Sequence, residues 1–105
     1  MEAANLEYIN NLSGDNIEFK TKLISILKRE LPLEIETYQL EMKVSNLNLA
    51  AQAVHKLKHK VSILGLEKSY YIASDFEDNL KQDSLTLQDE FETILNLMQE
   101  FVKDL

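Results

Sequence analysis

The chain has 105 residues, so we expect a single domain over residues 1–105. Hydrophobic residues make up 45% of it, which excludes a disordered polar chain, and two Gly and one Pro favour long helices over a turn-rich sheet. The net charge of −7 argues against nucleic-acid binding, because nucleic-acid phosphates require a basic surface.

The compartment is predicted from what the sequence lacks. No cysteine is present, which excludes disulfides and thiolate metal sites and fits a reducing compartment. No stretch approaches the roughly 18 apolar residues that a membrane span requires. The N-terminus also lacks a basic region followed by an apolar run. We therefore expect a cytoplasmic protein that does not insert into membranes.

The first predicted element is a short helix over residues 3–12. Its apolar residues at helical spacing are Leu6, Ile9 and Leu12. Gly14 can take the left-handed conformation that ends a helix. Asp15 or Asn16 can then accept hydrogen bonds from the first free amides of the next helix.

A long apolar stripe follows and is interrupted by a proline. Between residues 17 and 31 it consists of Ile17, Leu23, Ile24, Leu27 and Leu31, and it continues through Ile35, Tyr38 and Met42. Because Pro32 removes an amide and crowds the preceding turn, we expect either a kink or a new helix beginning there.

The next predicted helix spans residues 46–64 and opens at Ser45 or Asn46. Its buried face is predicted to contain Ala50, Ala53, Val54, Leu57, Val61 and Leu64. At about 100° per residue, His55 lies roughly 150° from the centre of that stripe. His59 lies one turn further along the same outer face. Both histidines are therefore predicted to be exposed.

Residues 55–60 hold three lysines and two histidines without a carboxylate, in an otherwise acidic chain. A lysine cluster is usually an ordinary solvated helix face. Here it surrounds an exposed imidazole, and an imidazole with the ordinary pKa of about 6.5 is a usable nucleophile at cellular pH. This combination favours a functional interpretation.

Gly65 permits a tight reversal into a helix over residues 66–82. The apolar face of that helix consists of Leu66, Tyr70, Ala73 and Leu80, and Glu77 interrupts it. His55 lies ten residues before Gly65 and Glu77 twelve after it, so at about 1.5 Å per residue the two reach nearly the same level. Glu77 could orient the imidazole by accepting its N–H. Alternatively, it could lie at the edge of the stripe and reach water.

The chain ends with a loop over residues 82–84 and a helix from about Thr86 to Lys103. The apolar positions of this helix are Leu87, Phe91, Ile94, Leu95, Met98 and Phe101. Short connections between long amphipathic helices favour antiparallel neighbours. The predicted fold is all-α, an antiparallel up-down four-helix bundle with a short additional N-terminal helix.

The region around His55 resembles the histidine-containing phosphotransfer (HPt) domain of multistep bacterial phosphorelays. The residues that carry this resemblance are His55, Leu57, Lys58 and Gly65, preceded by an alanine-rich approach at Ala50, Ala51 and Ala53. The segments Leu12-Ser13-Gly14-Asp15 and Glu30-Leu31-Pro32 look like the opening part of that family. One departure is His59, at a position where the family usually has Gly or another small residue.

The resemblance implies a phosphocarrier, with His55 accepting a phosphoryl group from a receiver-domain aspartate and passing it to another receiver domain. Lys58 would stabilise phosphoryl charge, and Glu77 would orient the imidazole. The expected partner-binding residues are Lys56, His59, Lys60, Ser62 and Ile63. The partners would be response-regulator receiver domains or a hybrid histidine kinase, and we expect a monomer that needs no cofactor of its own.

No nucleotide-binding motif is present, so we do not expect the chain to act as an enzyme alone. The resemblance implies that the receiver domain would supply the divalent metal ion. His55 and His59 also have the i, i+4 spacing of two zinc ligands. Metal binding is disfavoured because the chain has no cysteine and the surrounding lysines repel a cation. A second candidate function is a helical adaptor that binds receiver domains without phosphotransfer, which His59 favours.

Overall fold

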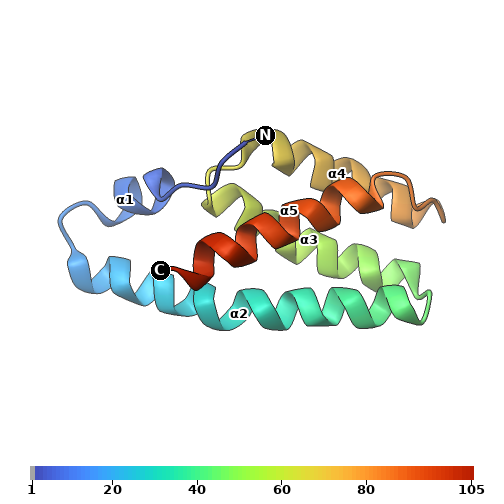
Figure 1. The fold of residues 1–105 in the computed structure, drawn as a ribbon, viewed down its shortest axis with the longest axis horizontal. Coiled ribbons are helices and arrows are strands. Elements are labelled where there is room, and N and C mark those ends of the chain that lie inside the picture. The colour runs from blue at the N-terminus through green and yellow to red at the C-terminus, as the bar shows by residue number, and fades with distance from the viewer. Residues whose placement is uncertain (1) are drawn as a thin grey trace.

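The computed structural model describes residues 2–105, and within that range it contains five helices and no strand. The helices are α1 (Glu7–Ser13), α2 (Ile17–Lys43), α3 (Leu47–Ile63), α4 (Glu67–Lys81) and α5 (Gln88–Lys103) (Figure 1). Helix α3 packs against both α2 and α4, α5 contacts α4 and α2, and α1 packs on α2. The prediction of an all-helical bundle is therefore confirmed.

Two asparagines begin the long helices as predicted. The side-chain oxygen of Asn16 accepts a hydrogen bond from the amide of Phe19, and that of Asn46 accepts one from the amide of Leu49. These caps satisfy amides that have no partner inside the helix.

The turn between α3 and α4 requires a glycine. Gly65 has a φ of +76°, and a Cβ built on it would lie 2.6 Å from the side chain of Asn5. The amide of Asn5 donates to the carbonyl of Leu64, and the Glu2 carboxylate accepts from the amides of Lys68 and Ser69. The N-terminal segment is thus attached to this turn, and α1 begins at Glu7 and not at residue 3.

Helix α2 runs without interruption through Pro32, so the prediction of a new helix beginning there is wrong. Proline has a helical φ, but it removes one amide hydrogen bond and crowds the carbonyl four residues earlier. Buried Leu31 and Ile35 on either side hold the helix in the core. Ile17 is 76% exposed, against expectation. The first turns of α2 lie at the end of the molecule, beyond the other long helices (Figure 1).

The last helix begins later than its pattern indicates. Leu87 has a φ of +77°, so the backbone becomes helical only at Gln88, and Leu87 itself is half-buried. The remaining predicted positions of α5 pack on the core, together with Val102, which was not predicted.

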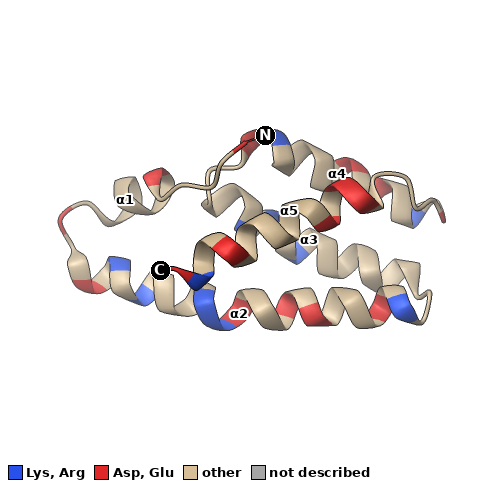
Figure 2. Ribbon diagram, in the orientation of Figure 1, with Lys and Arg blue, Asp and Glu red and all other residues tan. Residues whose placement is uncertain are grey.

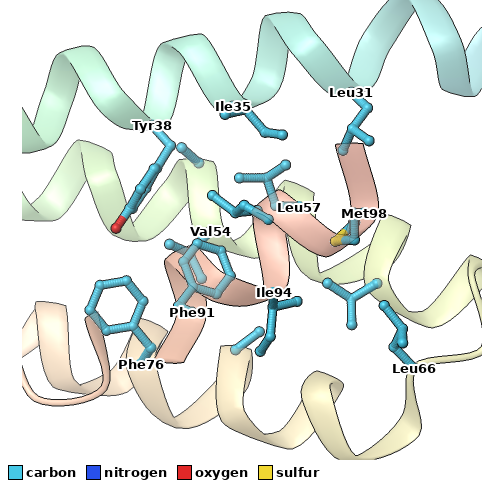
Figure 3. Packing of buried hydrophobic residues seen from close by; sticks show 14 of the residues in the cluster. Leu31, Ile35, Tyr38, Val54, Leu57, Leu66, Phe76, Phe91, Ile94 and Met98 are labelled. Atoms are coloured by element: carbon cyan, nitrogen blue, oxygen red, sulfur yellow. The ribbon is translucent and has the colours of Figure 1, made fainter. Parts of the chain in front are cut away.

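Three aromatic rings from three different helices, Tyr38, Phe76 and Phe91, pack together in the core (Figure 3). Their centroids lie 5.2 to 6.2 Å apart, within the range of favourable aromatic pairs. Val54 of α3 is fully buried in the same core. Since Val54 precedes His55 and Phe76 precedes Glu77, the packed core fixes the backbone at both positions.

Candidate functional site

Helix α3 presents His55 to solvent because its opposite face is buried. The six predicted core positions of this helix are all buried: Ala50, Ala53, Val54, Leu57, Val61 and Leu64. The side chain of His55 is 55% exposed. The predicted exposure of His55 is confirmed.

Glu77 on α4 holds one side of the imidazole. Its Oε2 lies 3.0 Å and its Oε1 3.3 Å from His55 Nδ1, and the Glu77 side chain is only 7% exposed. The alternative in which Glu77 reaches water is therefore wrong. The spacing of His55 and Glu77 around Gly65 predicted this contact, because the turn at Gly65 makes α3 and α4 run side by side.

Two lysines neutralise the buried carboxylate. Lys58 Nζ lies 2.9 Å from Glu77 Oε1, and Lys81 Nζ lies 3.1 Å from Oε2. Lys58 is buried and also has its ammonium 5.6 Å from the centre of the Tyr70 ring, whereas the Lys81 side chain is 56% exposed. We call His55, Lys58, Glu77 and Lys81 the Glu77 cluster.

The charge of Glu77 follows from these contacts. Burial by itself would raise the pKa of Glu77, but hydrogen bonds from Lys58 and Lys81 outweigh burial, and the net pKa is lowered from the ordinary carboxyl value. An ionised carboxylate can only accept hydrogen bonds. His55 must therefore donate from Nδ1, and in the neutral ring this leaves the lone pair on Nε2.

The other ring nitrogen, Nε2, belongs to a side chain that is more than half exposed. Within residues 2–105, no side chain or backbone group forms a hydrogen bond with Nε2. A neutral imidazole with Nδ1–H held by a carboxylate and Nε2 free is a nucleophile or general base that needs no further reorientation.

The opposite flank of α3 carries a second ion cluster with reversed charge. Lys60 Nζ lies 2.9 Å from Glu34 Oε2 and 3.1 Å from Glu30 Oε1, both on α2, and the Lys60 side chain is 12% exposed. Burial alone would lower the pKa of Lys60, but the two carboxylates raise it overall. We call Glu30, Glu34 and Lys60 the Lys60 cluster. Lys60 thus lies on the flank of α3 that faces α2, away from the Glu77 cluster.

The remaining predicted site residues lie at different depths. Lys56, His59 and Ser62 are exposed on α3. The His59 ring packs edge-to-face on the His55 ring with centroids 5.2 Å apart. Ile63 was expected on the outer surface, but it is half-buried against the core because α1 covers that end of α2 and α3.

Two features of this region were missed from the sequence. Lys81 joins Glu77 because they are four residues apart on one helix, a spacing that could have been recognised. An apolar groove of about 320 Å³ also lies between α2 and α3 beside Lys56. Its lining includes Leu33, Thr37, Leu49, Gln52 and Ala53. Those residues come from two helices, so only their packing forms the groove.

The charge distribution sets α3 apart from its neighbours. The described helices α2, α4 and α5 carry acidic residues along their lengths, whereas α3 has lysines and no acidic residue (Figure 2). The helix that exposes His55 is thus less acidic than the other long helices.

Residues 2–105 contain neither a cluster of metal ligands nor a membrane-spanning helix. No three or more His, Asp or Glu side chains of this range converge as metal ligands. None of the helices in the same range is both long and apolar enough to cross a bilayer.

No protein-family model matches the chain, and no curated protein or solved structure matches it either. The site must therefore be interpreted from its own geometry.

Proposed function

We propose that this protein is a histidine phosphotransfer domain of a two-component phosphorelay, with an up-down four-helix bundle built from α2 to α5. The observation that supports this most directly is the His55 imidazole, which is exposed, bound at Nδ1 by buried Glu77, and free at Nε2. A phosphocarrier requires this combination of a fixed ring and an accessible nitrogen.

The proposed step is an in-line phosphoryl transfer. The Nε2 lone pair of His55 attacks the phosphorus of a phosphoaspartate on a receiver domain. The Nε2–P bond forms while the P–O bond to the aspartate breaks, and the aspartate leaves as a carboxylate with the electron pair. The reverse sequence, on a second receiver domain, delivers the phosphoryl group.

Partner binding is assigned to the surface around His55. Exposed Lys56, His59 and Ser62 surround the imidazole on α3, and the α2–α3 groove adds apolar area beside Lys56. Positive charge on this face complements the acidic pocket of a receiver domain, which also contributes the divalent metal ion. Lys60 contributes less to this surface because Glu30 and Glu34 already hold its ammonium. We place the domain in the cytoplasm, as a monomer.

Lys58 and Lys81 are the two cations near the reacting ring. Lys58 was expected to reach the phosphoryl oxygens, and its ammonium is 2.9 Å from Glu77. Lys81 is half exposed and shares Glu77 Oε2 with the imidazole, so its flexible side chain can also approach a phosphoryl group. Either would stabilise developing negative charge.

The test is incubation with phosphorylated receiver domains. After denaturation of the labelled protein, we expect label that is lost in acid and stable in base, and we expect none on His55→Gln. A second candidate function is an adaptor that docks receiver domains without transfer. His59 favours it, because its ring lies against His55 where a small residue would leave more room. Binding without any acid-labile label would support the adaptor.

A further inference from the structure

We propose that Glu77 acts as the counter-ion of the phosphorylated ring and keeps Nδ1 of phosphohistidine 55 protonated, so that phosphotransfer needs no proton movement. This inference rests on the proposed function and goes beyond orientation of the imidazole. It concerns the charge of the phosphorylated ring and hence its lifetime.

The starting point is the chemistry of the two ring nitrogens. When Nε2 takes a phosphoryl group, the ring becomes a cation for as long as Nδ1 keeps its hydrogen. Loss of that hydrogen gives a neutral phosphoimidazole, which is a poorer leaving group. The state of Nδ1 therefore decides how readily the phosphoryl group departs.

Glu77 biases that choice strongly. A carboxylate has no hydrogen to donate, so its contact of 3.0 Å with Nδ1 is favourable only when Nδ1 carries one. A cationic ring also gains charge–charge attraction from the same buried anion. A catalytic triad stabilises its imidazolium in this way. An amide at this position could rotate and donate to a bare Nδ1, and would impose no such preference.

The surrounding charges keep Glu77 able to do this. Lys58 and Lys81 each donate to one of its oxygens, so the carboxylate remains ionised although it is buried. On α3, His59 faces the His55 ring. On the α2 side, the titratable groups along the groove beside Lys56 are Glu34 and Glu41. Among the described residues, Glu77 is the one carboxylate that contacts the imidazole.

The consequence is a transfer step with a stationary proton. The hydrogen stays on Nδ1, hydrogen-bonded to Glu77, before the attack and in the phosphorylated ring. It is still there after the Nε2–P bond has been cleaved and the phosphoryl group has left. The phosphorylated protein should be short-lived and reactive at a pH where an unassisted phosphohistidine is already neutral.

The experiment uses potassium phosphoramidate, which phosphorylates imidazoles directly and releases ammonia, so no receiver domain is involved. The chain has two histidines, so His59→Gln carries label on His55 alone and His55→Gln carries it on His59 alone. His59 contacts no carboxylate within residues 2–105 and serves as the internal control. The third protein is Glu77→Gln in the His59→Gln background.

Two readouts decide the outcome. Nitrogen-15 NMR at about pH 8 should show a protonated Nδ1 in phosphohistidine 55, but a bare one in phosphohistidine 59 and in the Glu77→Gln protein. Phosphorus-31 NMR should show a rate of phosphate loss from the His59→Gln protein that is nearly constant between about pH 6 and pH 9. In the other two proteins this rate should fall by about tenfold per pH unit above the pH at which Nδ1 of the phosphohistidine loses its proton.

A bare Nδ1 in phosphohistidine 55, or one common pH profile for all three proteins, overturns the inference. The His55→Gln protein, which is labelled on His59, keeps Glu77 and its two lysines. It therefore gives a comparison even if Glu77→Gln disturbs the fold. Failure of the proposed function is recognised separately, because it appears as absence of label from phosphorylated receiver domains.

Discussion

The two flanks of α3 bury charge in opposite ways. Toward α4, the Glu77 cluster buries one carboxylate among two lysines and an imidazole, and the imidazole keeps a free nitrogen at the surface. Toward α2, the Lys60 cluster buries one ammonium between two carboxylates and contains no imidazole. Both clusters join helices, but only the first leaves a reactive atom available.

The difference shows that buried lysine and glutamate side chains can either only join two helices or also hold a reactive side chain in place. Each cluster satisfies a charge that would be costly to bury alone. The two clusters differ in which side chains reach the surface. The Lys60 cluster reaches it through the half-exposed Glu30 carboxylate, whereas the Glu77 cluster reaches it through Lys81 and the His55 imidazole. Four predictions break or sharpen this contrast.

The largest expected effect is on phosphoryl acceptance. His55→Gln should abolish acid-labile labelling by a phosphorylated receiver domain, since Nε2 is lost, while leaving helical circular dichroism unchanged because the side chain is largely exposed. His59→Gln is the matched control and should retain labelling. The opposite pattern, with label surviving on the His55 variant, would transfer the acceptor role to His59.

The second effect is on stability. Glu77→Ala leaves Lys58 buried without its carboxylate, so we expect a loss of about 3–5 kcal/mol in the free energy of unfolding. Lys60→Met removes a cation whose partners are more exposed, and should cost about 1–2 kcal/mol. Urea denaturation measures both. Equal costs would mean that the two clusters do not differ in the way their burial indicates.

The third prediction concerns the mechanism of Lys58. Lys58→Ala should lower the single-turnover transfer rate at saturating receiver domain, by the equivalent of about 2–4 kcal/mol in the barrier. Exposed Lys56→Ala should instead weaken association and reduce its salt dependence, because one screened attraction to the acidic partner is lost.

A double-mutant cycle with Glu77→Gln then locates the action of Lys58. If Lys58 contacts the phosphoryl group itself, the two losses in transfer rate should add. If it acts by holding Glu77, through the 2.9 Å contact, the double variant should be little slower than Glu77→Gln alone. An unchanged maximal rate in Lys58→Ala would reduce this lysine to a structural role.

The smallest effect is in the pH dependence of stability, and it has opposite signs for the two clusters. The folded pKa of Glu77 is below the ordinary 4.5, so its contribution is present above that value and is lost as the pH falls through the folded pKa. The folded pKa of Lys60 is above the ordinary 10.5, so its contribution is present below that value and is lost as the pH rises through the folded pKa.

Two variants test these signs. Glu77→Gln should flatten the acid limb of the stability profile and leave the alkaline limb as in the unmodified protein, and Lys60→Met should do the reverse. Urea midpoints measured from about pH 3 to pH 11 give both limbs. A change in the same limb for both variants would contradict the assignment of charges.

The sequence alone determined the elements of the site, because local rules govern them. Helical periodicity placed the α3 core stripe inside and His55 outside, and the spacing around Gly65 brought Glu77 to the level of His55. Asn16 and Asn46 were readable as caps for the same reason, since a cap bonds amides three residues away.

Only the tertiary structure decided how the charges pair and where the partner surface lies. Lys58 could have extended to solvent, but packing of α4 on α3 turned it toward Glu77 and Tyr70. The continuity of α2 through Pro32 was decided in the same way, because burial of Leu31 and Ile35 outweighs the hydrogen bond that the proline cannot donate. These outcomes depend on contacts between residues distant in the chain, and periodicity within one helix carries no information about them.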